Sequence, residues 1–163
     1  MTRRVARILF GLTLCFGAAW LPVRAQDKDG PAIVPQAERD LAAKKNLSGP
    51  TQNKGIRIIK PIGAVELGSE FPTTAGRQLR AREMVIEPGG VVAVHQHDAR
   101  PGMAYILEGE IVEHRNDQSQ PLLRKAGDAA FEKTGISHWW ENRSPYPVRA
   151  LVVDIVPVEK KQQ

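Results

Sequence analysis

The chain has 163 residues, with 23 lysines and arginines against 18 aspartates and glutamates, and a formal net charge of +5. Four of the basic residues fall in the first 25 positions, so the remainder has 19 basic and 18 acidic residues and a net charge of +1. The sequence has no stripe of basic residues that would indicate nucleic acid as a partner. The length after position 25 suits one domain.

The first 25 residues have the pattern of a secretory signal peptide. Three arginines lie within residues 2–7, an apolar run covers residues 8–21, and small residues stand at the cleavage positions in residues 23–25. The run is shorter than the roughly 20 residues of a transmembrane helix. We therefore expect cleavage before Gln26, no stable membrane anchor afterwards, and an exported protein, periplasmic or secreted.

Two further features of the signal bear on its route. The pair Arg3-Arg4 hints at a twin-arginine signal, which exports folded protein. The only cysteine, Cys15, lies inside the apolar run directly after Leu14, so we do not expect lipidation. After cleavage no thiol remains, and stability must come from the core rather than from disulfides.

Residues 26–55 are predicted to form a polar N-terminal arm. They contain three prolines and several lysines. One short helix is expected at residues 36–45, with only a weak apolar stripe. We interpret the arm as partly ordered and suited to wrap a neighbouring subunit.

From Ile56 onward, short β-rich stretches alternate with turn signals such as Pro88-Gly89-Gly90 and Asn116-Asp117. This pattern, without a long helical period, predicts an all-β antiparallel barrel or double-sheet jelly roll over residues 56–157, followed by a C-terminal tail at residues 158–163. The expected strands are 56–60, 64–67, 78–86, 91–97, 103–107, 111–115, 122–124, 129–132, 138–142 and 149–156.

The most informative strand covers residues 90–97, which are apolar and β-branched and end in His95-Gln96-His97. Side chains alternate between the faces of a strand, so the two histidines point the same way, about 7 Å apart along the backbone. Two imidazoles on one face can bind one ion at about 2 Å from each nitrogen if another strand supplies a third ligand. The pair therefore predicts a metal site, although surface strands also carry such pairs by chance.

Two sets of residues repeat the spacing of known motifs. The first set is Gly89 or Gly90, His95, His97 and Gly109. The second set is Gly127, Gly135, His138 and Asn142, with Lys133 where that motif has proline. Together, and in this order, they resemble the two motifs of the cupin family, and the resemblance covers roughly residues 56–157. It implies a single cupin double-stranded β-helix.

One departure from the family pattern concerns the metal. The family's glutamate ligand falls on position 102, where this chain has Gly102. The remaining His95, His97 and His138 resemble the cupins that bind iron through three histidines. The resemblance implies one divalent transition metal ion, with iron, copper, zinc, nickel and manganese all open, and coordination positions left free for a substrate or oxygen.

Other residues near the motifs are not expected to bind the metal. Asp98 follows His97 directly and should face away on a regular strand, and Glu108 lies beside a turn near the rim. His114 is expected at the surface or behind the metal ligands. Glu110 and Glu113 are expected to be solvated, so no general acid or base stands out.

Strand alternation also predicts a ligand pocket. If position 102 faces inward, so do Ala104 and Ile106, and if His138 faces inward, so do Trp140 and Asn142. Trp140 is then either a pocket wall or ordinary core. On the opposite parity, Trp139 and Tyr105 would form an apolar outer face suited to a homodimer, which is common among cupins.

Three arginines admit two interpretations. Arg100 follows the metal strand, where a guanidinium can hold a substrate carboxylate or simply be solvated, and the solvated position is the more frequent one. Arg80 and Arg82 share one face of the preceding strand. They are pocket groups if that face is inward and solvated if it is outward, which is commoner for charged pairs.

The resemblance implies a metal-dependent, dioxygenase-like enzyme acting on a small molecule, of the quercetin, cysteine or acetylacetone dioxygenase type. The alternative is a non-catalytic cupin that binds a small ligand or metal. Both functions imply a small-molecule partner, and fold alone does not decide between them.

Overall fold

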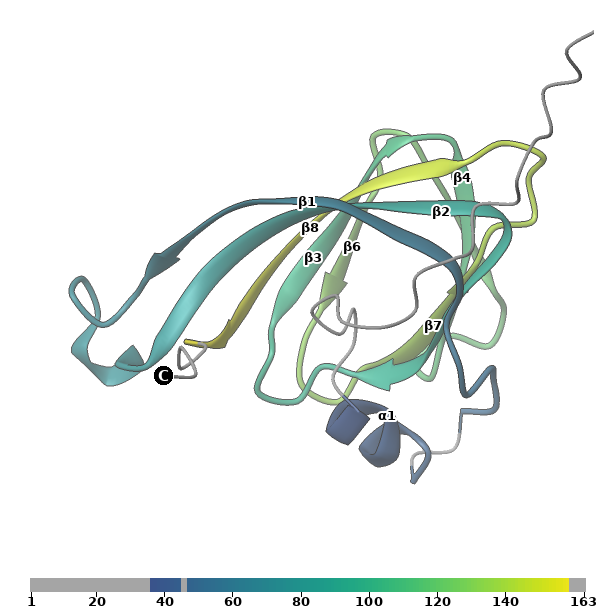
Figure 1. Ribbon diagram of the computed structural model, residues 1–163. Helices are drawn as coiled ribbons and strands as arrows, with labels where there is room; N and C mark the ends of the chain where they lie inside the picture. Colours follow the sequence, from purple (N-terminus) through teal and green to yellow (C-terminus); the bar gives the residue numbers. More distant parts are fainter. Residues whose placement is uncertain (1–35, 45–46, 159–163) are drawn as a thin grey trace, which may run out of the picture.

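A computed structural model describes residues 36–44 and 47–158 of the chain. Within these residues it consists of a short helix, α1 (Gln36–Ala42), and one eight-stranded antiparallel sheet that curls into a barrel (Figure 1). The predicted all-β fold is therefore confirmed. The predicted signal peptide and most of the C-terminal tail lie outside the described residues. No helix in the described part is long and apolar enough to cross a membrane.

The strands follow each other along the sheet in the order β5-β4-β7-β2-β8-β3-β6, and β1 pairs with β2 beside this path. A 3-10 turn (Pro72–Thr74) lies between β1 and β2. The strands are β1 (Lys54–Glu66), β2 (Arg77–Gln96), β3 (Gly102–Glu108), β4 (Glu110–Arg115), β5 (Leu122–Lys125), β6 (Ala129–Glu132), β7 (Ser137–Glu141) and β8 (Val148–Pro157).

Strand β2 is longer than the sequence predicts, because it runs through Pro88-Gly89-Gly90 instead of turning there. Its first half, up to Ile86, pairs with β8, and its second half, from Val91, pairs with β7. Gly89 has a φ of 70°, and a Cβ on Gly90 would lie 2.7 Å from the carbonyl oxygen of Glu87. The glycines thus permit a bend at which β2 passes from one pairing to the other.

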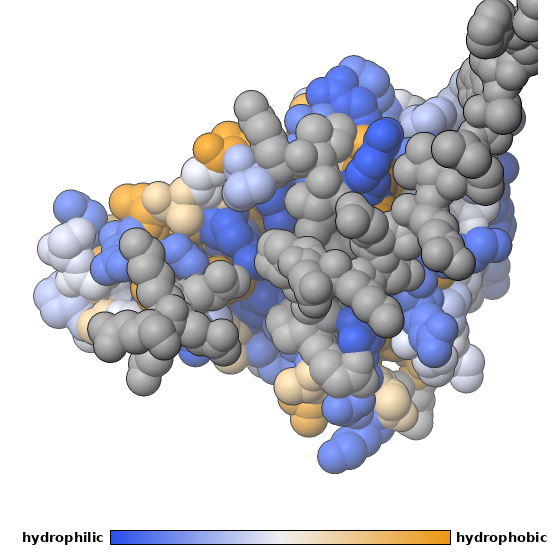
Figure 2. All heavy atoms as spheres, in the orientation of Figure 1, coloured by the Kyte–Doolittle hydropathy of each residue, from blue (hydrophilic) through white to orange (hydrophobic). Residues whose placement is uncertain are grey.

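The second half of β1 and the first half of β2, which pair with each other, project from the barrel as a long ribbon (Figure 1). Figure 2 shows hydrophobic side chains interspersed with hydrophilic ones on this projecting end. The two strands expected at 56–60 and 64–67 are one continuous strand here, β1, with register shifts near Pro61. Four apolar side chains of this region are exposed: Ile62, Val65, Phe71 and Leu79.

The core lies inside the barrel and follows strand alternation. On β8, for example, Val148, Ala150 and Val152 are buried while the residues between them are only partly buried. The buried apolar cluster is Met84, Ile86, Val92, Ala104, Ile106, Ile111, Ala130, Trp140, Val148, Ala150 and Val152.

The described part of the N-terminal arm packs against its own barrel. The backbone N–H of Val94 donates to the Pro50 carbonyl at 2.8 Å, and that of Ala93 donates to Asn53 Oδ1 at 2.8 Å. Gly49 lies directly against Val94 and Trp139. Trp139, expected to form an outer face for a second subunit, is partly covered here by the chain's own segment and stacks on His114, with ring centroids 3.7 Å apart.

Candidate metal centre

Two strands bring three histidines together inside the barrel. His95 lies near the end of β2, His97 follows that strand, and His138 is the Cα partner of His95 on β7. All three are buried, with at most 3% exposure. The Nε2 atom of His138 lies 2.9 Å from Nε2 of His97 and 3.0 Å from Nε2 of His95.

Each of these rings is held by an oxygen at its other nitrogen. Nδ1 of His95 lies 2.8 Å from the Ala93 carbonyl, and Nδ1 of His97 lies 3.1 Å from the Arg100 carbonyl. Nδ1 of His138 lies 2.8 Å from Oε1 of Glu113. These oxygens can only accept, so each Nδ1 carries the proton and each Nε2 presents a lone pair. Three lone pairs facing one another cannot satisfy each other, whereas one cation between them satisfies all three.

The electrostatics keep His95 and His97 in the form that binds a metal. Burial lowers the pKa of His95 well below its ordinary value, and the neighbouring His138 lowers it further. Burial, with His138 and Arg100 nearby, lowers the pKa of His97 to about 2. Both imidazoles are therefore neutral near pH 7, as metal ligands must be. Two nitrogens bound to one ion at about 2.1 Å stand roughly 3.0 to 3.4 Å apart, so the cluster suits a single transition metal ion.

Glu113, which we expected to be solvated, is fully buried behind His138. It also accepts from Arg115 at 3.0 Å and from Arg124 at 2.9 Å. Burial alone would raise the pKa of Glu113, but the hydrogen bond from His138 and the positive charge of Arg115 outweigh it and lower the pKa. Strand alternation could have predicted the burial of Glu113, because Glu113 lies on the same strand face as the apolar Ile111.

A second buried carboxylate, Glu132, was also not identified from the sequence. Glu132 ends β6 opposite Gly102 of β3 and is 5% exposed. Its Oε2 lies 3.4 Å from Nδ1 of His97, and its Oε1 lies 3.6 Å from Nε2 of His138. Burial raises the pKa of Glu132 above its ordinary value, although His138 and Arg100 act in the opposite direction.

The side chains that we did not expect to bind the metal lie elsewhere. Asp98 accepts a hydrogen bond from the Gly135 backbone at 2.8 Å. Glu108 is exposed and pairs with Arg149. His114 bonds to Glu141 at 2.8 Å and stacks on Trp139, away from the three-histidine cluster.

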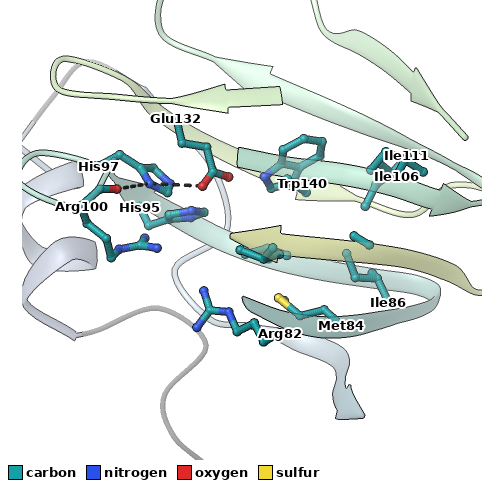
Figure 3. A pocket seen from close by; sticks show the side chains of 14 residues that line it. Arg82, Met84, Ile86, His95, His97, Arg100, Ile106, Ile111, Glu132 and Trp140 are labelled. Atoms are coloured by element: carbon teal, nitrogen blue, oxygen red, sulfur yellow. Dashed lines mark hydrogen bonds and ion pairs between the residues drawn. The ribbon is translucent and has the colours of Figure 1, made fainter. Parts of the chain in front are cut away.

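A cavity of about 490 Å³, including space open to solvent, adjoins the cluster (Figure 3). His95, His97, Arg100, Arg82 and Glu132 gather at its polar end, while Ile86, Ile106 and Ile111 line the other end. Of the predicted pocket residues, the structure places Arg100, Ala104, Ile106 and Trp140 in its wall.

Asn142, also predicted for the pocket, is not among the residues that line this cavity. Its side-chain amide donates to the carbonyl of Ile86 at 2.9 Å and to that of Tyr146 at 2.7 Å. Asn142 therefore fixes the chain after β7.

The three arginines favoured as solvated side chains instead surround one buried carboxylate. Asp154 on β8 is fully buried and accepts from Arg80, Arg82 and Arg100 at 3.0 to 3.1 Å. Arg100 also makes two 2.6 Å bonds to Glu38 of α1. Burial lowers the pKa of Arg82 to about 10, so it stays charged at neutral pH. Within the part of the chain that the structure describes, the buried Nε of Arg82 has no hydrogen-bond partner.

Comparisons with known proteins find sequences similar to this chain. Residues 82–154 match the sequence model of the cupin domain. A protein of Thermotoga maritima named oxalate-binding protein is 38% identical over 73 residues, which are 45% of this chain and 59% of that protein. The chain thus matches less than two thirds of that relative's length.

Two solved structures share the fold at low sequence identity. A cupin domain from Schizosaccharomyces pombe superposes with a TM-score of 0.50 at 14% identity, covering 63% of this chain and 62% of that chain. The polyketide cyclase RemF from Streptomyces resistomycificus has a TM-score of 0.50 at 22% identity, covering 72% of this chain and 80% of its own. Both similarities concern the fold alone.

Proposed function

We propose that this chain, whose residues 82–154 match the cupin domain, is a cupin that binds one divalent transition metal ion through His95, His97 and His138 and captures a small carboxylate-bearing molecule beside it. The observation that carries the metal proposal is the set of three buried Nε2 atoms facing one another, each fixed by an oxygen behind its ring.

The arginines at the polar end of the cavity support an anionic ligand. Arg82 and Arg100 line the cavity beside the histidines. The buried Nε of Arg82, which has no partner among the described residues, can donate to a ligand, and a carboxylate suits a guanidinium better than a neutral group does. The name of the oxalate-binding relative is consistent with a small carboxylate ligand.

The opposite end of the cavity supports a ligand with a small apolar part. Trp140 lies between the polar end and the isoleucines that close the other end (Figure 3). A bound metal would act as a Lewis acid on ligand oxygens. The residues of this chain would orient the carboxylate through Arg82 and exclude water through the apolar walls.

Calorimetric titration of oxalate into metal-loaded protein tests this function. We expect saturable binding to the wild type, and weaker binding after Arg82→Gln. Arg57→Gln, which changes an exposed arginine that pairs with Glu87, is the matched control. Absence of oxalate binding to metal-loaded wild type, or equal binding by both variants, would contradict the carboxylate proposal.

A dioxygenase-like activity is the second candidate, because three neutral imidazoles leave coordination positions for oxygen and substrate. Oxygen uptake by iron-loaded or copper-loaded protein with diketones, flavonols or thiols would support it. Binding without uptake would favour the non-catalytic role.

We also propose a homodimer and export. The exposed apolar side chains of the β1–β2 ribbon support the dimer, and light scattering of Phe71→Glu against wild type tests it. N-terminal sequencing of protein from the periplasm or culture medium tests cleavage before Gln26.

A further inference from the structure

Glu132 has one carboxylate oxygen that the fold leaves unsatisfied. Oε2 is buried and lacks a hydrogen-bond partner among the described residues. It lies 3.4 Å from Nδ1 of His97, but the single proton on that nitrogen is directed to the Arg100 carbonyl. Leaving a buried acceptor unpaired destabilises the fold, and the effect is larger for a charged group. A cation next to Glu132 would remove that effect.

The carboxylate of Glu132 points to the same place as the histidines. Oε1 lies 3.6 Å from Nε2 of His138, the atom that the other two Nε2 atoms face. Two ligand atoms on one ion stand roughly 3.0 to 3.4 Å apart at bond lengths near 2.1 Å. A movement of a few tenths of an ångström would therefore bring Oε1 into that range. Figure 3 shows Glu132, His95 and His97 converging at the polar end of the cavity.

The neighbouring strand explains why the carboxylate comes from β6. Gly102 of β3 is the Cα partner of Glu132. A Cβ on Gly102 would lie 2.7 Å from the Val153 carbonyl and 3.2 Å from Oε2 of Glu132. Position 102 thus has no room for a side chain, and the carboxylate of Glu132 occupies the space in front of it.

We propose that Glu132 is the fourth protein ligand of the metal ion, so that a carboxylate from β6 completes the three-histidine site. This inference rests on the proposed metal binding. A carboxylate changes the site in two ways: it adds one negative charge to three neutral imidazoles, and its hard oxygen favours ions such as Mn²⁺ and Fe²⁺ more than a purely nitrogen site does. The ion would in turn offset the burial of Glu132.

Cobalt(II) titration of the demetallated full protein tests the assignment, with affinity and the visible absorption bands as the two readouts. We expect Glu132→Gln to keep one-to-one binding, to weaken affinity on the order of 10- to 100-fold, and to shift the bands. Glu83→Gln, which changes a carboxylate paired with Arg149 outside the cavity, should match the wild type. Glu132→Asp, which keeps the charge but shortens the reach, should also shift the bands.

The other outcomes are distinct. Wild-type affinity and bands in Glu132→Gln would overturn the proposal. Weaker binding with unchanged bands would also overturn it, because Glu132 would then act only through its charge and not as a ligand. If the wild type binds no cobalt, or if His138→Ala binds as tightly as the wild type, the proposed metal function itself fails, and Glu132 fails with it. Should Glu132→Gln not fold, Glu132→Asp supplies the same two readouts.

Discussion

Each histidine of the cluster is oriented by an oxygen behind its ring, and for His138 that oxygen belongs to a side chain. Glu113 is buried and holds His138, Arg115 and Arg124 together. The sequence identified the three histidines from spacing. It did not identify Glu113, because a carboxylate on a strand is ordinarily solvated and only the tertiary structure encloses this one.

We expect Glu113→Ala to weaken metal binding on the order of 10- to 100-fold, as loss of a ligand's outer partner does. The substitution leaves His138 without its acceptor and two arginines without their carboxylate. Competition with a chromophoric chelator measures the affinity. Glu141→Ala removes a partly exposed carboxylate on β7 and is the control, and equal affinities of the two variants would contradict this role.

The demetallated protein is expected to lose stability as pH falls below about 6.5, the ordinary pKa of histidine. Burial lowers the folded-state pKa of His95 and His97, so the unfolded chain takes up protons first. Their stabilising effect is complete above about pH 6.5 and is lost towards the folded pKa, at up to about 1.4 kcal/mol per pH unit for each ring. Glu132, whose pKa burial raises, acts in the opposite direction.

Urea unfolding with a chelator between about pH 7.5 and 5 measures this dependence. His97→Gln should show a shallower decline than the wild type, because one buried imidazole is missing. A decline as steep as that of the wild type would contradict the assignment.

At the scale of elements, β8 ties the barrel together. It pairs with β2 on one side and β3 on the other. Its inward positions are apolar except for Asp154, which binds arginines from β2 and from the loop before β3. The sequence predicted this strand, but it could not predict the ion cluster, because the partners lie 54 to 74 positions away in the chain.

Asp154→Ala is expected to lower the free energy of unfolding by about 3–5 kcal/mol, since it leaves buried arginines unpaired. Arg80→Gln should cost less, because Arg80 is 19% exposed and two arginines remain on Asp154. Urea denaturation compares the two variants. A smaller loss for Asp154→Ala than for Arg80→Gln would show that the cluster is not held together by Asp154.

At the scale of the whole molecule, the barrel was predictable because turns and alternation recur along the chain, and most predicted strands exist within a few residues of their expected ends. Two features could not be predicted from the sequence. The continuous β2 passes through a Pro-Gly-Gly sequence that ordinarily ends a strand. Glu132 reaches the cluster through a pairing between β6 and β3 that no local pattern encodes.

A bound metal should stabilise the entire domain, because the three ligands come together only in the folded chain. We expect a chelator to lower the melting temperature of the wild type by several degrees and to leave His138→Ala unchanged. Differential scanning calorimetry gives both values. A chelator effect of the same size in His138→Ala would place the metal elsewhere.

Elemental analysis of protein from its native compartment shows whether His95, His97 and His138 bind one metal ion. We predict about one transition metal ion per chain in the wild type and almost none in His97→Ala. His114→Ala should retain the metal. A metal-free wild type, or equal metal in wild type and His97→Ala, would show that the three histidines do not form a metal site.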